Sequence, residues 1–459
     1  MNILQKIKEV FLKMFHRDIQ EKYKSETLSS AYINALDLWQ KMYIGKAPWS
    51  TRYIESMRLE TGICRELANV TLSEMTVSAS QKNINMILQN AVDNIDIPLQ
   101  KGLAMGSFII RPLGNGKFEF ISAEKFIPLK FDTLGKLLSV VLVSELEENG
   151  NHYTRLEKHE LSPLTHTLTI SNSAFFSKSS SDIGKPIPLS AVPEWANLPE
   201  SVSYNVDRMD LGYFRTPIAN DIDGTQAPVS IYQTSVDLIK QADKLQAQLN
   251  WEFESGERVV HVDDRALAPM DRRKFNDKDG DNKVMPNLNE RLYRGLNLMG
   301  MSGNDTLYKE YSPQFREQNI LNGLNSVLRK IEFNCGLAYG DLSEMDSREK
   351  TAEEIKTSKQ RKYNTVNSIQ RKLKECIEDF VWSLCFHERC VGAGAGVVIN
   401  FNDSILTSEK EEKAQDKEDV ALGIMSIVEY RMKWYGETEA VAKKALKSIM
   451  TADYESNTE

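Results

Sequence analysis

One long helical segment, from about residue 350 to residue 388, constrains the fold of this chain more than any other feature. Its first half is polar and carries Glu353, Glu354, Lys356, Lys359, Gln360, Arg361 and Lys362. Its second half carries apolar residues at helical spacing, namely Val366, Ile369, Leu373, Ile377, Phe380, Val381 and Leu384. Because a helix that is polar early and apolar late lies in two environments, we expect this segment to span the boundary between them.

The hydrophobic period changes once in the first half of the chain. Residues 1 to about 106 have the apolar spacing of helices, including a segment that ends near Gly45 and another from Tyr53 to Met75. Strand patterns follow at residues 137–146, 152–161 and 166–171, and Asn149-Gly150 has the composition of a tight hairpin turn. We therefore predict an antiparallel meander. Residues 172–228 are rich in proline and serine and are expected to be irregular.

The second half of the chain is mainly helical. Two helices, at about 229–254 and 313–334, flank a small, charged and turn-rich insert that begins with a strand at 258–262. A polar loop at 338–349 leads into the long helix. A strand at 397–400 and two helices, at about 411–434 and 437–451, are expected to complete an α+β chain.

Composition restricts which functions the charge of the chain can serve and in which compartment the chain works. Hydrophobic residues make up 41% of 459 residues, which is enough for a large core, and the formal net charge is −8. That acidic balance argues against tight neutralisation of nucleic-acid phosphates as the main task. The odd number of cysteines and the lack of a secretory signal predict a reduced, cytoplasmic setting.

No apolar run is long enough to span a bilayer. Residues 1–17 carry an amphipathic helical stripe, which we expect to dock on its own protein, with a membrane-surface helix as the alternative.

The sequence offers no convincing catalytic, cofactor or metal site. A phosphate loop would require glycine where Arg111 stands, five residues before Gly116. The acidic turn of Asp277, Asp279 and Asp281 lacks the glycine and the glutamate of a calcium loop, so only weak cation binding stays open there. Cys376, Cys385, His387 and Cys390 lack the paired short spacing of structural zinc, and we interpret the two helical cysteines as small hydrophobes.

The segment from Tyr213 to Val262 carries a family resemblance. It reads Tyr213-Phe214-Arg215-Thr216-Pro217, then Asn220 and Pro228-Val229-Ser230-Ile231-Tyr232, then Asp243 and the run from Glu252 to Val260. This pattern resembles the portal proteins of phages with long non-contractile tails that infect Gram-positive bacteria, which are also described as minor capsid proteins. The order of elements agrees over nearly the whole chain. Val229 is a departure, because relatives are expected to have glycine there.

The resemblance implies an α+β portal fold that forms a ring. It has a mixed α/β wing, a two-helix stem, a small α/β clip, a long bridging helix and a helical crown. The wing would comprise residues 1–228, the stem helices 229–255 and 313–336, the clip 256–312, the tunnel loop 337–349, the long helix with a returning wing strand 350–407, and the crown 408–459.

The function implied by the resemblance is structural. A dodecameric ring at one capsid vertex would pass double-stranded DNA during packaging and ejection, without sequence preference, and would contact major capsid and scaffold proteins. Such a protein belongs to the virion, and to the host cytoplasm during assembly. The tunnel loop and the helix after it would present Glu344, Asp346, Arg348, Lys350 and Lys356 to the DNA. The clip would bind the terminase large subunit and a head–tail adaptor protein through Arg272, Arg273, Lys274 and Lys278.

Two other readings of the sequence compete with this one. The first is another capsid-associated structural or connector protein without a DNA channel, although connectors are usually much shorter and scaffolds mostly helical. The second is an enzyme of the packaging motor, such as a nuclease or an ATPase. An enzyme of that kind would need clustered carboxylates or a phosphate loop, and neither can be argued from this sequence. No membrane partner, cofactor or metal is expected.

Overall fold

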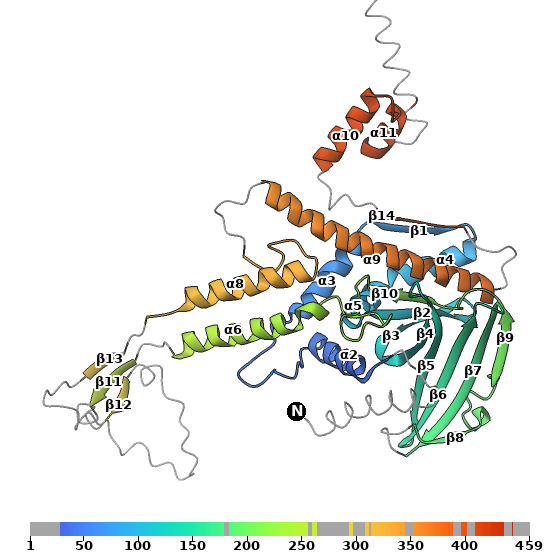
Figure 1. The fold of residues 1–459 in the computed structure, drawn as a ribbon, viewed down its shortest axis with the longest axis horizontal. Coiled ribbons are helices and arrows are strands. Elements are labelled where there is room, and N and C mark those ends of the chain that lie inside the picture. Colours follow the sequence, from blue (N-terminus) through green and yellow to red (C-terminus); the bar gives the residue numbers. More distant parts are fainter. Residues whose placement is uncertain are drawn as a thin grey trace, which may run out of the picture.

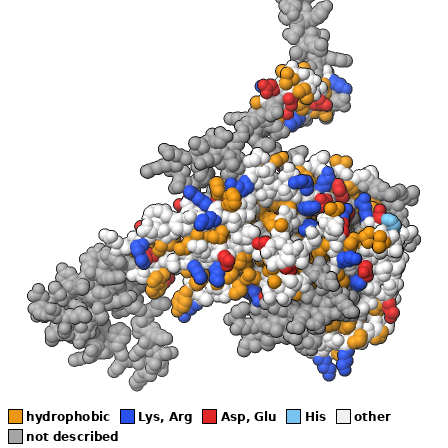
Figure 2. All heavy atoms as spheres, in the orientation of Figure 1, with side chains coloured by type: hydrophobic (Ala, Val, Ile, Leu, Met, Phe, Trp, Pro, Cys, Tyr) orange, Lys and Arg blue, Asp and Glu red, His pale blue; other side chains and the backbone are white. Residues whose placement is uncertain are grey.

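The computed structural model describes residues 28–178, 183–255, 259–263, 293–296, 308–311, 314–344, 352–388, 396–401, 409–435 and 443. A body of helices and sheets lies at one side, and two helices extend from it side by side (Figure 1). Figure 2 shows Lys and Arg interspersed with Asp, Glu and apolar side chains on the visible face of the body, so no single basic surface dominates that face.

The N-terminal part of the body is helical, as predicted, but it also contains a strand that the sequence pattern did not reveal. Its helices are α2 (Ser30–Tyr43), α3 (Leu59–Leu72), α4 (Lys82–Asp93) and α5 (Asp96–Met105). Between α3 and α4 lies β1 (Met75–Ala79), which pairs antiparallel with β14 (Val397–Phe401). The prediction of helix alone was wrong here, because a five-residue strand is defined by a partner more than 300 residues away. The residues before Leu28 lie outside the described part.

The predicted meander is the largest sheet of the described residues. Its strands run in the order β4-β5-β6-β7-β8, and β9 also pairs with β7. Asn149 and Gly150 have φ values of +53° and +75°, so the predicted hairpin turn is confirmed. The bounds are β4 (Phe126–Phe131), β5 (Leu137–Glu148), β6 (Asn151–Ser162), β7 (Thr167–Ser177), β8 (Lys185–Ile187) and β9 (Ser201–Asn205).

A second sheet has three strands and contacts the long helix. It follows the order β10-β2-β3, with β2 (Ser107–Gly114), β3 (Lys117–Ser122) and β10 (Gly212–Arg215). Together with β7, β8 and β9, strand β10 shows that the prediction of an irregular segment at residues 172–228 was wrong. The prolines are consistent with the short length of β8, β9 and β10 and confine β8, which contains Pro186, to a sheet edge, but they do not prevent pairing.

Two antiparallel helices, α6 (Val236–Ser255) and α8 (Glu317–Asn334), form the extension. Both begin later than predicted. The prediction for α6 was wrong at residues 229–232 because this segment is tied to the body: the Ile231 N–H donates to the Leu103 carbonyl at 2.9 Å. Beyond the far ends of the two helices, β11 (Val259–Asp263) lies between β12 (Tyr293–Leu296), which is parallel to it, and β13 (Tyr308–Tyr311), which is antiparallel.

The long helix α9 (Ala352–His387) confirms the predicted segment. The apolar residues of its second half are buried, as are Cys376 and Cys385, and the helix packs on β10 and β2 and also contacts α3, α4 and β14. Lys359 and Gln360, in the first half, are exposed. The helix therefore joins a polar and an apolar environment, as its sequence requires.

The C-terminal residues form a helical hairpin in place of the single helix predicted at 411–434. The chain turns at Gly423, which has a φ of +74°, between α10 (Glu409–Ala421) and α11 (Ile427–Tyr435). The helix predicted at 437–451 lies almost wholly outside the described residues. Within the part of the chain that the structure describes, no helix has both the length and the apolar character needed to cross a membrane.

Candidate functional site

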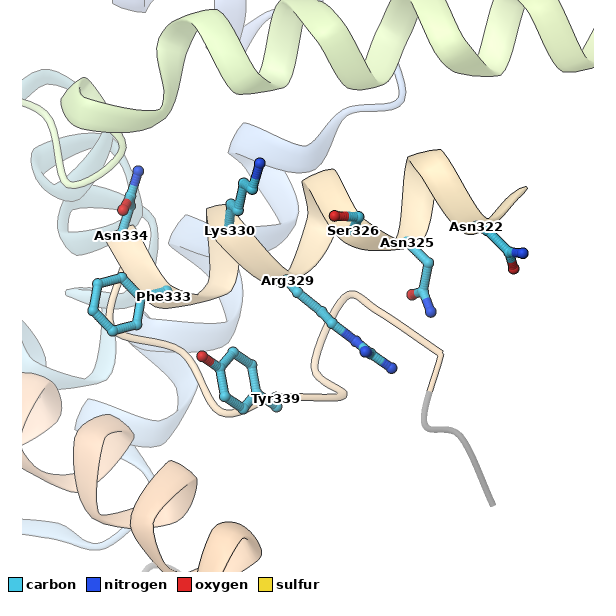
Figure 3. A pocket seen from close by; sticks show the side chains of 8 residues that line it. All are labelled: Asn322, Asn325, Ser326, Arg329, Lys330, Phe333, Asn334 and Tyr339. Carbon is cyan, nitrogen blue, oxygen red and sulfur yellow. The ribbon is translucent and has the colours of Figure 1, made fainter. Parts of the chain in front are cut away.

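The candidate site is built around the chain that leaves α8 and leads toward α9. Gly336 ends α8 with a φ of +70°, its N–H donates to the Phe333 carbonyl, and the next N–H, of Leu337, donates to the Glu332 carbonyl at 2.8 Å. These two bonds form a Schellman motif, which satisfies the last carbonyls of a helix and reverses the chain. The following residues, 338–344, fold back along α8 (Figure 3).

Glu332 organises this returning segment from inside. Its side chain is fully buried, and Oε1 accepts the backbone N–H groups of Gly340, Leu342 and Ser343 at 3.0, 2.7 and 2.8 Å. Oε2 accepts the Ser343 hydroxyl at 2.9 Å. Gly340 has a φ of +98°, which confirms that a glycine provides a bend here. Four hydrogen bonds to one carboxylate fix the segment because bonds to an ionised acceptor are stronger than neutral ones.

Two further contacts fasten the segment at its edges. At the outer end, the Asn325 Oδ1 accepts the Glu344 N–H at 2.9 Å. On the other side, Lys362 of α9 lies 3.1 Å from Asp341 and 2.6 Å from Glu66 of α3. Burial alone would lower the pKa of Lys362, but these two carboxylates raise it above its ordinary value. The segment is thus attached both to α8 and to the start of α9.

An aromatic contact from α9 completes the support. The Arg361 guanidinium lies 4.6 Å from the centre of the Phe333 ring and 4.8 Å from the centre of the Tyr339 ring. Both distances are typical of cation–π interactions. Arg361, which belongs to the polar half of the long helix, is therefore engaged with the returning segment and α8.

A shallow hollow of about 590 Å³ lies between α8 and this segment (Figure 3). Amide and hydroxyl groups dominate its lining, and Arg329 and Lys330 add two cations. No group of three or more His, Cys, Asp or Glu side chains placed to hold a metal ion occurs among the described residues. The hollow offers polar contacts from one face of α8, namely Asn322, Asn325, Ser326, Arg329, Lys330 and Asn334, and from Tyr339 of the returning segment.

The sequence of the chain matches a family model over residues 69–452, which is most of its length. That family is described as "Phage portal protein, SPP1 Gp6-like". The chain belongs to this portal family. The matched residues include the two extended helices, the returning segment and the long helix, so these elements of the candidate site lie within the matched region, whereas Glu66 precedes it.

Solved structures and curated proteins give a weaker comparison for this portal-family chain. No curated protein matches it significantly in sequence. It is similar to a chain of "Neck of native GTA particle computed with C12 symmetry", at 10% identity and a TM-score of 0.44, over 81% of this chain and 87% of that one. A chain of "Virion of native gene transfer agent (GTA) particle" is similar at 10% identity and a TM-score of 0.44, over 87% and 92%.

The structure places only part of the predicted channel and clip residues of the portal-family chain. Glu344 is exposed at the end of the returning segment. Lys356 lies in the first turns of α9. The other predicted residues lie outside the described part, namely Asp346, Arg348 and Lys350 of the loop and Arg272, Arg273, Lys274 and Lys278 of the clip.

Sequence reasoning missed the residues that support the loop. The sequence does mark Glu332 as a candidate for a buried acidic residue. It lies eight residues after Leu324 and four after Leu328, and so falls on the apolar stripe of α8. An acidic residue on such a stripe requires buried hydrogen-bond donors. Asn325 and Arg361 left no comparable signal, because polar residues are common on exposed helix faces.

Proposed function

We propose that this chain is a portal protein that assembles into a dodecameric ring at one capsid vertex and passes double-stranded DNA in packaging and ejection. The observation that carries the proposal is the portal family match over residues 69–452. The role is structural and not enzymatic. Ring closure suits the chain because a head-to-tail interface repeated by a fixed rotation closes on itself.

Within this proposal, α6 and α8 are stem helices and residues 337–349 are the tunnel loop. The first part of this loop is held on α8 by Glu332 and Asn325. That anchoring supports the assignment, because the residues that follow leave from a fixed base in every subunit. Glu344, Asp346, Arg348, Lys350 and Lys356 would then form rings of mixed charge around the DNA. Their contacts would be to phosphates, independent of sequence and sensitive to salt.

We assign residues 256–312 to the clip, which binds the terminase large subunit during packaging and a head–tail adaptor afterwards. The small sheet of β11, β12 and β13 beyond the ends of α6 and α8 supports a separate unit at this place. The basic residues Arg272, Arg273, Lys274 and Lys278 are the proposed contacts. Residues 1–228 with 350–407 would make the wing, and 408–459 the crown.

The proposed location is the portal vertex of the virion, with assembly in the host cytoplasm. Major capsid and scaffold proteins are the proposed neighbours at that vertex. The acidic balance of the chain supports a channel more than a DNA clamp, because many basic contacts would hold the phosphates against the packaging motor.

Electron microscopy of the purified full-length chain tests the ring, together with its mass in solution and an ATPase assay. We expect rings with a central channel and no ATP hydrolysis. Monomers at every concentration and salt, with no rings in virions, would contradict the proposal, and ATP hydrolysis by the pure chain would favour the motor enzyme.

Two pairs of variants test the proposed contacts within the ring. Neutralising Arg348 and Lys350 to Gln should alter packaging or DNA retention while rings form. Reversing charge at Arg272 and Arg273 should weaken terminase docking with ring formation intact. Glu55→Gln is a suitable control, because Glu55 is exposed and distant in sequence from both segments. Unchanged packaging in either pair would remove that contact from the proposal.

A further inference from the structure

Glu60 is a buried carboxyl group to which the contacts described so far give no role. It lies in the first turn of α3 and has no exposed surface. Neither of its carboxyl oxygens has a hydrogen-bond partner on another residue. Buried charged groups are normally paired or hydrogen-bonded, because the cost of removing an isolated charge from water is large. A group in this position is therefore stable in the core chiefly when it carries a proton.

The surroundings of Glu60 are a joint between the body and the extended helix pair. Asp243 of α6 is buried there and already accepts two hydrogen bonds, from the Trp49 indole N–H and the Met57 backbone N–H, each at 2.8 Å. Lys240 of α6 lies over the Trp49 ring at 5.8 Å. The segment that leads into α3 is thus fastened to α6 by Asp243, and Glu60 lies directly after that segment.

Other titratable groups face this joint from three directions. Cys64 lies one turn further along α3, Cys335 follows α8, and Tyr232 precedes α6; all are buried. The Tyr232 hydroxyl donates its hydrogen bond to the Trp39 carbonyl at 3.0 Å and therefore does not donate to Glu60. Arg58 stands two residues before Glu60 and is exposed at the start of α3. None of these groups provides the buried carboxylate with a hydrogen bond.

Electrostatics agree with this geometry. Burial is the largest effect and raises the pKa of Glu60 from 4.5 to about 7. The backbone N–H of Glu60 itself opposes this rise, the negative charge of Asp243 adds to it, and the positive charge of Arg58 opposes it. The group therefore changes charge close to neutral pH, where an ordinary glutamate is fully ionised.

We propose that Glu60 is a proton-controlled lock at the joint between the helical body and α6. When Glu60 is neutral, the segment before α3 can pack against Asp243. When Glu60 is ionised, it places a second negative charge beside Asp243 in the core and weakens that packing. The lock depends on the packing within one chain and goes beyond the portal role, so it can hold or fail independently of ring formation.

The sign of the effect follows from linkage. Glu60 has a higher pKa in the folded chain than in the unfolded chain. Such a carboxyl favours folding most at a pH below its pKa in the unfolded chain, and this contribution is lost as the pH rises through its pKa in the folded chain. Between pH 4.5 and pH 8 the folding equilibrium should weaken on the order of a hundredfold from this group alone, because each pKa unit corresponds to a factor of ten.

The test compares full-length wild type with Glu60→Gln, which keeps the shape and removes the charge. Glu55→Gln is the matched control, because Glu55 is exposed a few residues earlier in the same segment. Urea unfolding and hydrogen exchange of residues 49–64 and 236–249 are measured from pH 5 to pH 8.5. We expect the stability of Glu60→Gln to exceed that of wild type by an amount that grows from pH 5 to about pH 7.5 and is constant above it, with slower exchange in both segments at neutral pH, and Glu55→Gln to follow wild type.

An infrared difference spectrum keeps the inference testable if the Gln variant folds poorly. A protonated carboxyl band should be present in wild type and in Glu55→Gln at pH 5.5 and should disappear near pH 8. The absence of such a band near pH 6, or a Glu60→Gln stability that runs parallel to wild type at every pH, would overturn the lock.

Discussion

Replacement of Glu332 with alanine is the most direct test of how the returning segment is held. The change removes the acceptor of three backbone N–H groups and one hydroxyl, while the side chain that is lost has no exposed surface. Gly340 is exposed, so water can replace the carboxylate there. Leu342 is half-buried and Ser343 buried, so their N–H groups lose a partner that water reaches poorly.

The expected cost follows from those two groups. An unsatisfied buried donor costs about 1–3 kcal/mol, so Glu332→Ala should lower the free energy of unfolding by about 2–6 kcal/mol if the segment stays in place. If the segment detaches instead, the loss is smaller and its amides exchange freely. Glu332→Gln keeps one acceptor oxygen and should lose about 1–2 kcal/mol, because neutral hydrogen bonds are about half as strong as charged ones.

Hydrogen exchange of residues 336–344 combined with urea unfolding distinguishes these outcomes. Glu344→Ala is the control, because the Glu344 side chain is exposed and only its backbone is bonded to Asn325. The reasoning is refuted if Glu332→Ala unfolds within about 1 kcal/mol of wild type and its amides at 340–343 keep their protection.

Three further outcomes are expected. His159 is buried between Asp210, at 2.7 Å, and a second carboxylate; burial would lower its pKa, but the carboxylates raise it to about 9. Its charge therefore stabilises the fold fully below about pH 6.5, and this contribution is lost as pH rises through 9. The free energy of unfolding of wild type should fall by about 3 kcal/mol over this pH range because of His159, and that of His159→Gln should not show this fall. Gly106→Ala should lower the free energy of unfolding in urea by about 2–4 kcal/mol, because φ is +89° and a Cβ would lie 2.6 Å from a backbone carbonyl oxygen. Gly62→Ala should raise it by about 0.5–1 kcal/mol, because Gly62 lies in a helix and a Cβ there would have open space. Arg361→Ala should cost about 1–2 kcal/mol and speed exchange at 337–343, and wild-type exchange there would contradict the aromatic support.

The parts of the fold that were predictable from sequence are those defined by local period. The long helix, the hairpin at Asn149-Gly150 and the N-terminal helices all follow from residues close to one another in the chain. The errors concern β1, β8, β9 and β10, which have three to five residues each. Such strands are stabilised by partners far away, as the pairing of Thr76 with Asn400 illustrates, and no local pattern contains that information.

The candidate site was predictable only in outline. A polar loop between two helices with a bend at Gly340 could be read from the sequence. The support could not, because it depends on which helix faces meet: Arg361 reaches two aromatic rings, and Lys362 reaches Asp341, only once α8 and α9 are placed. Tertiary contact, not residue type, gives these side chains their roles.

The long helix is fastened near both ends, and this has a mechanical consequence. Near its start, Arg361 and Lys362 hold the returning segment. Near its other end, the Ser383 hydroxyl donates to the Asp210 carbonyl at 2.6 Å, and His387 lies 3.5 Å from the Asp210 carboxylate. A 36-residue helix is a rod about 54 Å long that resists compression along its axis. A push on the returning segment is therefore conveyed to the far side of the body as a displacement of the chain at Asp210, with little of it absorbed between.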